Sequence, residues 1–167
     1  MRSLILSLAL LAAAPALAKP WQGIEPGVSK KEEVLKKFGV PSKSVPSGDK
    51  EILAYLEKEA IKGTTQVQFR VGAEGLVERI DVFPGPVVDK ETVETSFGPS
   101  CASTPNAPAC YAKKITDDFQ TYFVYPKLGL AVFFKDDAKT VQSFVYQPVK
   151  AEGADTSTAK AKSGKSR

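Results

Sequence analysis

A short helical pattern with both ends marked occurs twice in this chain, and it constrains the possible folds more than any other feature. The first copy spans residues 29–41, where Ser29 followed by Glu32 is typical of a capping box and a Gly-Val-Pro run ends the helix. The second copy spans residues 89–99 and has a cap, a valine, a phenylalanine, a glycine and a proline in the same order. This repetition predicts two related structural units.

Alternating apolar and polar residues after each helix predict antiparallel strands. After the first helix, the expected strands are residues 51–57, 64–71 and 76–83. After the second helix, they are residues 118–125, 128–135 and 140–147. Residues 51–61 fit a strand or a helix, and the repeat favours the strand; residues 42–49 are expected to form a polar connector. The sequence therefore predicts an α+β fold of two tandem repeats, residues 19–84 and 85–149. Each repeat would pack a short helix, or a helix pair, on a three-stranded antiparallel sheet.

The two ends of the chain differ in composition from the part between them. Residues 1–18 combine Arg2, an apolar run and the small residues Ala16 and Ala18, as a cleaved signal peptide does. We therefore expect export to the periplasm or the medium, with no transmembrane segment in the mature chain, and no lipid anchor because no cysteine follows Ala18. Residues 150–167 are rich in lysine and small residues, which predicts a disordered tail that can touch anionic surfaces weakly.

The charge of the chain is concentrated in its ends. The whole sequence has a net charge of +4, but residues 19–149 carry 17 basic and 17 acidic residues, so the folded part is neutral. A neutral folded part lacks the basic surface that nucleic acids require. We expect no specific nucleic-acid binding.

Few residues of this chain suggest catalysis. The sequence has no histidine, which excludes Ser/His/Asp and Cys/His arrangements. Its two cysteines, Cys101 and Cys110, are predicted to form a disulfide in an exported chain. The pairs at 117–118 and 136–137 are adjacent aspartates that could form a carboxylate pair or a calcium site, but such pairs are more typical of turns. We expect no cofactor and no metal.

The outward faces of the two units differ in polarity. Aligning Pro84 with Pro148 pairs the polar outward residues Gln66, Gln68, Arg70, Arg79 and Asp81 of the first unit with Leu130, Val132, Phe134, Ser143 and Val145 of the second. Either Tyr122 and Val124 or Phe123 and Tyr125 would extend the second face. An apolar outer face is normally covered, either by another part of this chain or by a partner. We predict a partner-binding surface formed by Tyr122, Val132, Phe134 and Val145.

The run from Ile24 to Ser29, the Gly39-Val40-Pro41 stop and the strands that follow resemble the SmpA/OmlA (BamE-type) outer-membrane assembly domain. A tandem pair of such units resembles the β-lactamase-inhibitor-protein (BLIP) architecture. The resemblance covers residues 24–84, and residues 87–148 more loosely. It implies a non-catalytic protein-binding module, although the lipid-anchoring cysteine of the assembly lipoproteins is absent.

Together these features predict an exported, non-catalytic protein-binding module of the bacterial cell envelope, with envelope or outer-membrane assembly as a possible role. Its expected partner is an envelope or extracellular protein. A secreted enzyme inhibitor of the BLIP type is the alternative within binding, and a carboxylate-dependent enzyme is the alternative from another class. An acidic pair in a deep pocket would favour the enzyme, whereas a flat or concave aromatic sheet would favour the binding module.

Overall fold

The computed structural model describes residues 18–149, so the predicted leader before Ala18 and the predicted tail 150–167 lie outside the described residues. Two α-helices and eight strands follow one another, with two short 3-10 turns between them. In chain order they are α1 (Lys31–Phe38), β1 (Lys43–Ser47), β2 (Lys50–Leu56), η1 (Glu57–Glu59), β3 (Thr64–Val71), β4 (Val77–Pro84), α2 (Lys90–Phe97), β5 (Ala112–Ile115), β6 (Thr121–Tyr125), η2 (Pro126–Leu128), β7 (Leu130–Phe134) and β8 (Val141–Tyr146). No helix within residues 18–149 is long and apolar enough to cross a membrane.

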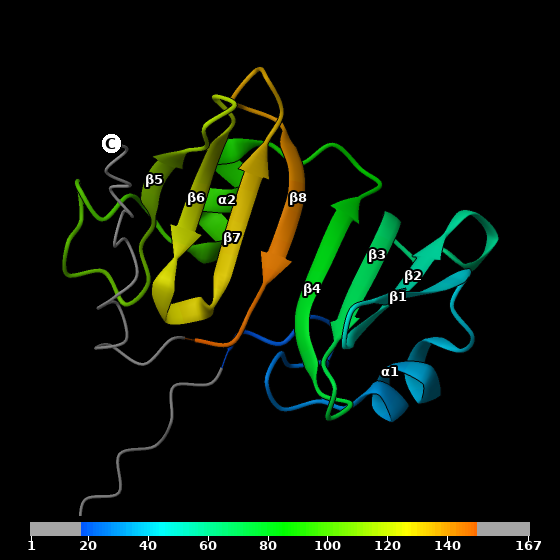
Figure 1. Ribbon diagram of the computed structural model, residues 1–167. Helices are drawn as coiled ribbons and strands as arrows, with labels where there is room; N and C mark the ends of the chain where they lie inside the picture. The colour runs from blue at the N-terminus through cyan, green and yellow to red at the C-terminus, as the bar shows by residue number, and fades with distance from the viewer. Residues whose placement is uncertain (1–17, 150–167) are drawn as a thin grey trace, which may run out of the picture.

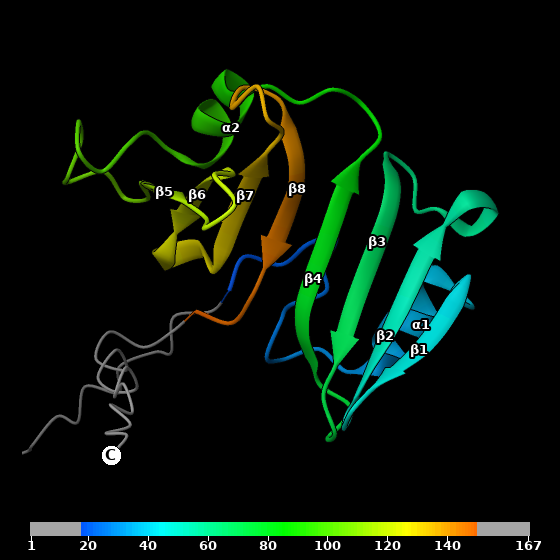
Figure 2. The ribbon, with the colours of Figure 1, turned by 45° about the horizontal axis from the view of Figure 1, so that its top comes forward.

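All eight strands belong to one antiparallel sheet, in the order β1-β2-β3-β4-β8-β7-β6-β5. Each helix precedes four strands, and the two groups of strands meet where β4 pairs with β8. Figure 1 shows α2 behind β6 and β7, and Figure 2 shows α1 behind β1 and β2. Both helices therefore cover the same face of the sheet, which is called the covered face below.

The prediction of two tandem repeats, each on a three-stranded sheet, is wrong. Two strands were missed: β1, which was expected to be a connector, and β5, which follows the disulfide loop. Every residue of both strands is exposed, so neither shows the apolar alternation that identifies a strand in a sequence. Pro46 lies in β1, where an edge strand tolerates it.

The continuous sheet also overturns the resemblance to tandem SmpA/OmlA or BLIP-like units. Four strands, not three, follow each helix, and β4 and β8 join through the pairs Ile80↔Tyr146, Asp81↔Val145 and Val82↔Phe144. One sheet with two helices replaces the two separate helix-on-sheet repeats. The strands expected at 51–57, 64–71 and 76–83 are confirmed as β2, β3 and β4 to within about a residue.

The two helices start with different caps. The cap of α1 lies one residue later than predicted, because the Lys30 backbone N–H donates to Glu33 Oε1 at 3.0 Å while Ser29 Oγ accepts from the Glu25 N–H at 3.2 Å. The cap of α2 is Asp89, whose Oδ1 accepts from the Thr92 N–H at 2.7 Å. That backbone hydrogen bond lowers the pKa of the Asp89 carboxyl.

The core fills the space between the covered face and the two helices. Fully buried side chains include Val34 of α1, Val93 of α2 and, from the strands, Leu53, Tyr55, Val67, Phe69, Ile80, Phe123, Tyr125, Leu130, Val132 and Phe134. Two buried tyrosines anchor the ends of the helices in the same way. The Tyr55 hydroxyl donates to the Gly39 carbonyl at 2.8 Å, and the Tyr125 hydroxyl donates to the Gly98 carbonyl at 3.1 Å.

The segment before α1 contacts both halves of the sheet. The Lys19 N–H donates to the Leu128 carbonyl at 3.0 Å, beside η2, whereas the Trp21 ring packs on Phe38 and Phe69 beside α1. Ile24 of this segment is 2% exposed. The covered face is thus closed by two helices and by this segment, which lies between them.

The predicted disulfide is confirmed: Cys101 and Cys110 are bonded, with their Cα atoms 4.9 Å apart. Gly98 precedes the closed loop with a φ of +117°, and a Cβ at this position would lie 2.2 Å from the Ala109 carbonyl oxygen. The loop therefore packs tightly against the end of α2, and a side chain at residue 98 would displace it.

Replacing both cysteines by serine should lower the free energy of unfolding by roughly 2.5–3 kcal/mol, because the unfolded chain regains the entropy of an open loop of that length. Urea unfolding of the double variant and of the oxidised protein measures this difference. A Thr104→Ala change in the same exposed loop serves as a control and should leave the midpoint unchanged. Equal midpoints for the serine variant and the oxidised protein would show that the bond does not stabilise the fold.

Candidate functional site

The face of the sheet opposite the helices is the main candidate site. Residues paired across antiparallel strands point to the same side, and alternate residues point to opposite sides. The pairs therefore place Ile52, Gln68, Arg70, Arg79, Asp81, Val145, Ser143, Phe133, Ala131, Tyr122 and Val124 on this side. We call it the open face, because the helices and the segment before α1 pack on the other side.

The β6–β8 half of the open face is apolar except for Ser143. Its apolar members, Tyr122, Val124, Ala131, Phe133 and Val145, are called the apolar patch. The Tyr122 and Phe133 rings are stacked with their centroids 4.9 Å apart, and both side chains are half-buried. Stacked aromatic side chains offer large contact area with little loss of conformational entropy on binding, which is why they are frequent in interfaces.

Two of the four residues predicted for the binding surface lie in the core instead. Val132 and Phe134 are fully buried, and the Phe134 ring packs edge-to-face on Phe123 at 4.7 Å. They point toward α2 because Val132 pairs with Phe144, whose ring contacts Phe97 of α2. The assignment of Val132 and Phe134 to the exposed surface is therefore wrong.

A one-residue slip in the alignment explains this error. Residues 72–76 connect β3 to β4, whereas residues 135–140 connect β7 to β8, so the second connection is one residue longer. The alignment on Pro84 and Pro148 correctly matched β4 with β8 but placed β7 one position out of register. Because side chains alternate along a strand, such a slip moves every side chain to the other face.

The other two predicted residues, Tyr122 and Val145, do lie on the open face. Val145 is only 2% exposed, and it is the register partner of Asp81 of β4. The alternation of β6 selects Tyr122 and Val124, and it places Phe123 and Tyr125 in the core. The expected polarity difference between the two halves of the face is therefore present, with Phe133 and Ala131 in the positions assigned to Phe134 and Val132.

The β3–β4 half of the open face is polar and ends in a hollow. Its volume is about 390 Å³, and its lining comprises Lys50, Arg70, Glu78, Arg79, Gln147 and Pro148. Arg79 holds Asp81 through Nε, at 2.9 and 3.0 Å from the two carboxylate oxygens, and through Nη2 at 2.5 Å. Lys50 Nζ lies 2.5 Å from Glu78 Oε2. Arg70, Arg79 and Asp81 lie on the face that the sequence predicts for them, whereas no pattern in the sequence indicates the hollow.

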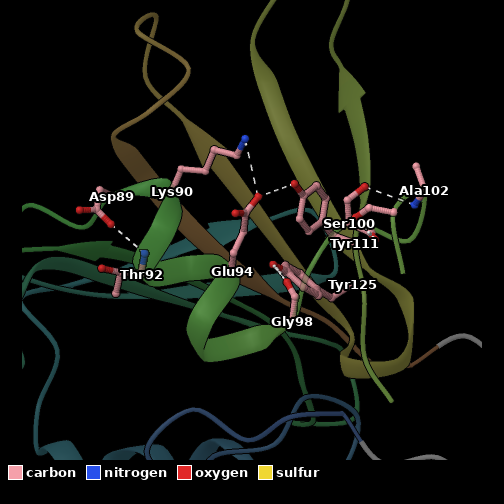
Figure 3. Close-up of polar contacts among 10 residues, drawn as sticks. Asp89, Lys90, Thr92, Glu94, Gly98, Ser100, Ala102, Tyr111 and Tyr125 are labelled. Carbon is pink, nitrogen blue, oxygen red and sulfur yellow. Dashed lines mark hydrogen bonds and ion pairs between the residues drawn. The ribbon is translucent and has the colours of Figure 1, made fainter. Parts of the chain in front are cut away.

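A second cluster of polar groups lies under the disulfide loop, on the covered face (Figure 3). The Tyr111 hydroxyl donates to Glu94 Oε1 at 2.5 Å, and Lys90 Nζ lies 3.6 Å from the same oxygen. Burial, and then the hydrogen bond to Glu94, raise the pKa of Tyr111 to about 12. A tyrosine with a raised pKa is a hydrogen-bond donor at neutral pH and a poor nucleophile, so this cluster is suited to holding the loop on α2.

The two aspartate pairs have the roles of turn residues. Asp137 Oδ1 accepts from the Lys139 and Thr140 N–H groups at 2.8 Å, and Thr140 Oγ1 donates to Oδ2 at 2.6 Å. The hydrogen bonds from Thr140 and Lys139 lower the pKa of Asp137 to about 2. Asp118 accepts a hydrogen bond from Thr116. Within residues 18–149, no three histidine, cysteine or acidic side chains are close enough to hold a metal ion.

Comparisons with known proteins yield one match in structure. No family model and no curated protein matches the chain. A solved structure, a DUF4309 family protein (YjgB) from Bacillus subtilis subsp. subtilis str. 168, is similar with a TM-score of 0.49 and 18% identity over 76% of this chain and 83% of that chain. The comparisons therefore give no support to the SmpA/OmlA or BLIP resemblance.

The two adjacent phenylalanines of β7 provide a matched test of the two faces. Phe134→Ala should lower the free energy of unfolding by roughly 3–5 kcal/mol, as removal of a core phenylalanine does. Phe133→Ala should cost less, because this half-buried side chain loses only part of that burial, and its aromatic pair with Tyr122 adds only about 0.5–1.5 kcal/mol. Urea unfolding of both variants measures the difference. Equal losses, or the larger loss at Phe133, would contradict the assignment of faces.

Proposed function

We propose that this chain is an exported, non-catalytic protein-binding module of the bacterial cell envelope and that it binds its partner through the open face. The partner is an envelope or extracellular protein. The observation that carries the proposal is the apolar patch: a stacked aromatic pair and aliphatic neighbours on the side of the sheet opposite both helices.

The composition of this face supports binding rather than a purely solvated role. Its β3–β4 half carries glutamines and arginines, so the same side of the sheet is compatible with water. The β6–β8 half replaces them with Tyr122, Val124 and Phe133. An apolar area beside polar residues on one sheet surface is the usual composition of an interface, with an apolar centre and a polar rim.

Two features support export. The sequence begins with a pattern typical of a signal peptide. The disulfide between Cys101 and Cys110 is of the kind that persists in oxidising compartments such as the periplasm or the extracellular space.

The non-catalytic part of the proposal rests on the residues available for chemistry. The sequence has no histidine, the commonest general acid and base. The polar clusters at Asp89, at Tyr111 and at Asp137 cap a helix, hold the disulfide loop and close a turn, and the carboxylates beside the hollow are held in ion pairs with Lys50 and Arg79. Binding is therefore the activity that the open face supports best.

Site-specific photocrosslinking in the producing bacterium tests the proposal. Phe133 is replaced by p-benzoylphenylalanine, and the same substitution at Val40, which is 82% exposed and follows α1, is the control. We expect a discrete adduct with another protein at Phe133 only, because the reactive group there faces the bound partner. Added wild-type protein should suppress the adduct, whereas added Phe133→Gln protein should suppress it much less.

Two outcomes would contradict the proposal. Identical adducts at positions 133 and 40 would show that contact is unspecific. An adduct of the chain with a second copy of itself at position 133 would make the open face a homodimer interface instead of a partner site.

A further inference from the structure

Two arginines lie directly opposite each other on the open face. Arg70 of β3 and Arg79 of β4 are partners in the register of the sheet, so their side chains leave the same face at neighbouring positions. Like charges in directly opposite positions destabilise an antiparallel pair. Asp81 already binds Arg79, so an anion beside the pair would offset the positive charge of Arg70 that remains.

Only one of these two charges is neutralised by the surrounding side chains. Arg79 binds Asp81 through Nε and Nη2, and Lys50 binds Glu78. For Arg70, no ion pair is found among residues 18–149. Three basic groups and two acidic ones therefore leave one positive charge in and beside the hollow, and that charge is centred on Arg70.

Asp81 alone separates the hollow from the apolar patch along β4. Asp81, which holds Arg79, is the register partner of Val145, a member of the patch. A segment lying on Tyr122 and Phe133 could extend across Val145 and place a side chain beside Arg70. The guanidinium fork of an arginine matches the two oxygens of a carboxylate.

We propose that the hollow at Arg70 and Arg79 binds a carboxylate from an acidic segment of the protein that docks on the apolar patch. This inference rests on the proposed function, since the same partner would occupy both halves of the open face. Charge complementarity identifies the segment: apolar side chains against the patch and an aspartate or glutamate at the hollow.

The charges elsewhere favour a protein segment over a polyanion. Residues 19–149 carry equal numbers of basic and acidic residues, 17 of each, whereas nucleic acids and anionic membranes are bound by extended basic surfaces. Here one uncompensated cation lies beside an apolar patch, which suits one carboxylate within a mostly apolar segment.

Two capped peptides test the carboxylate. One has the sequence Leu-Glu-Phe-Glu-Leu, and the other replaces each glutamate with glutamine. The exported chain is titrated with each, and the arginine Nε–H signals are followed by NMR. We expect the glutamate peptide to shift the Arg70 signal and to bind about fivefold more tightly, the upper range for a partly exposed ion pair.

Variants assign this difference to Arg70. Arg70→Gln should make the two peptides bind equally, and Arg70→Lys should keep part of the preference because the charge remains without the fork. Lys113→Gln, on the exposed edge strand β5, is the matched control for charge and should retain the full preference. A melting temperature within a few degrees of the wild type confirms that each variant is folded.

Three results would overturn the inference. The wild type could bind the two peptides equally, or Arg70→Gln could leave the preference for the glutamate peptide unchanged. The third result is displacement of the glutamate peptide by inorganic phosphate at a concentration below the dissociation constant of the peptide. The last result would assign the hollow to phosphate groups. The photocrosslinking experiment at position 133 distinguishes failure of the carboxylate site from failure of the proposed function. If the adduct at position 133 persists undiminished in Arg70→Gln, the binding function stands and only the carboxylate site is lost.

Discussion

The pairing of β4 with β8 is the interaction on which the rest of this structure depends. Only three residue pairs join these strands, but they convert two four-stranded groups into one sheet with two distinct sides. Ile80 and Val82 then meet Tyr146 and Phe144 on the covered face, so the core is shared across the seam. On the other side the same pairing brings Asp81 against Val145, and the polar and apolar halves of the open face become one surface.

Most of the fully buried side chains lie on the covered face, whereas the open face holds the apolar patch and the hollow. Helices, the segment before α1 and the disulfide loop all pack on one side, where tyrosines fix the helix ends and Tyr111 fixes the loop. Because these contacts bury the large side chains, the open face contributes less to folding. The proposed binding role would account for its stacked aromatics and for Arg70, which has no ion pair among residues 18–149.

The sequence was informative where local patterns are strong. The two helices, β2, β3 and β4, and the disulfide followed from helical patterns, alternation and cysteine spacing, although the cap of α1 lies one residue later than predicted. It was misleading where structure depends on long-range pairing: the edge strands β1 and β5 carry no pattern, since all their residues are exposed. The connection between β7 and β8 is one residue longer than that between β3 and β4, and this difference reversed the predicted faces of β7. Phe134 was therefore assigned to the surface on which Phe133 lies. No local signal indicated that two similar halves would join into one sheet, or that Arg70 would border a hollow.

The central claim, that one side of the sheet is open to a partner, is tested most directly by NMR with a soluble paramagnetic relaxation agent added to the whole protein. The account predicts strong relaxation enhancement for the Tyr122 and Phe133 rings and little for Val132 and Phe134, although all four lie on neighbouring positions of β6 and β7. If the Tyr122 and Phe133 rings were as protected as Phe134, the face would already be covered in the isolated protein. The open face could then not be the site where a partner binds.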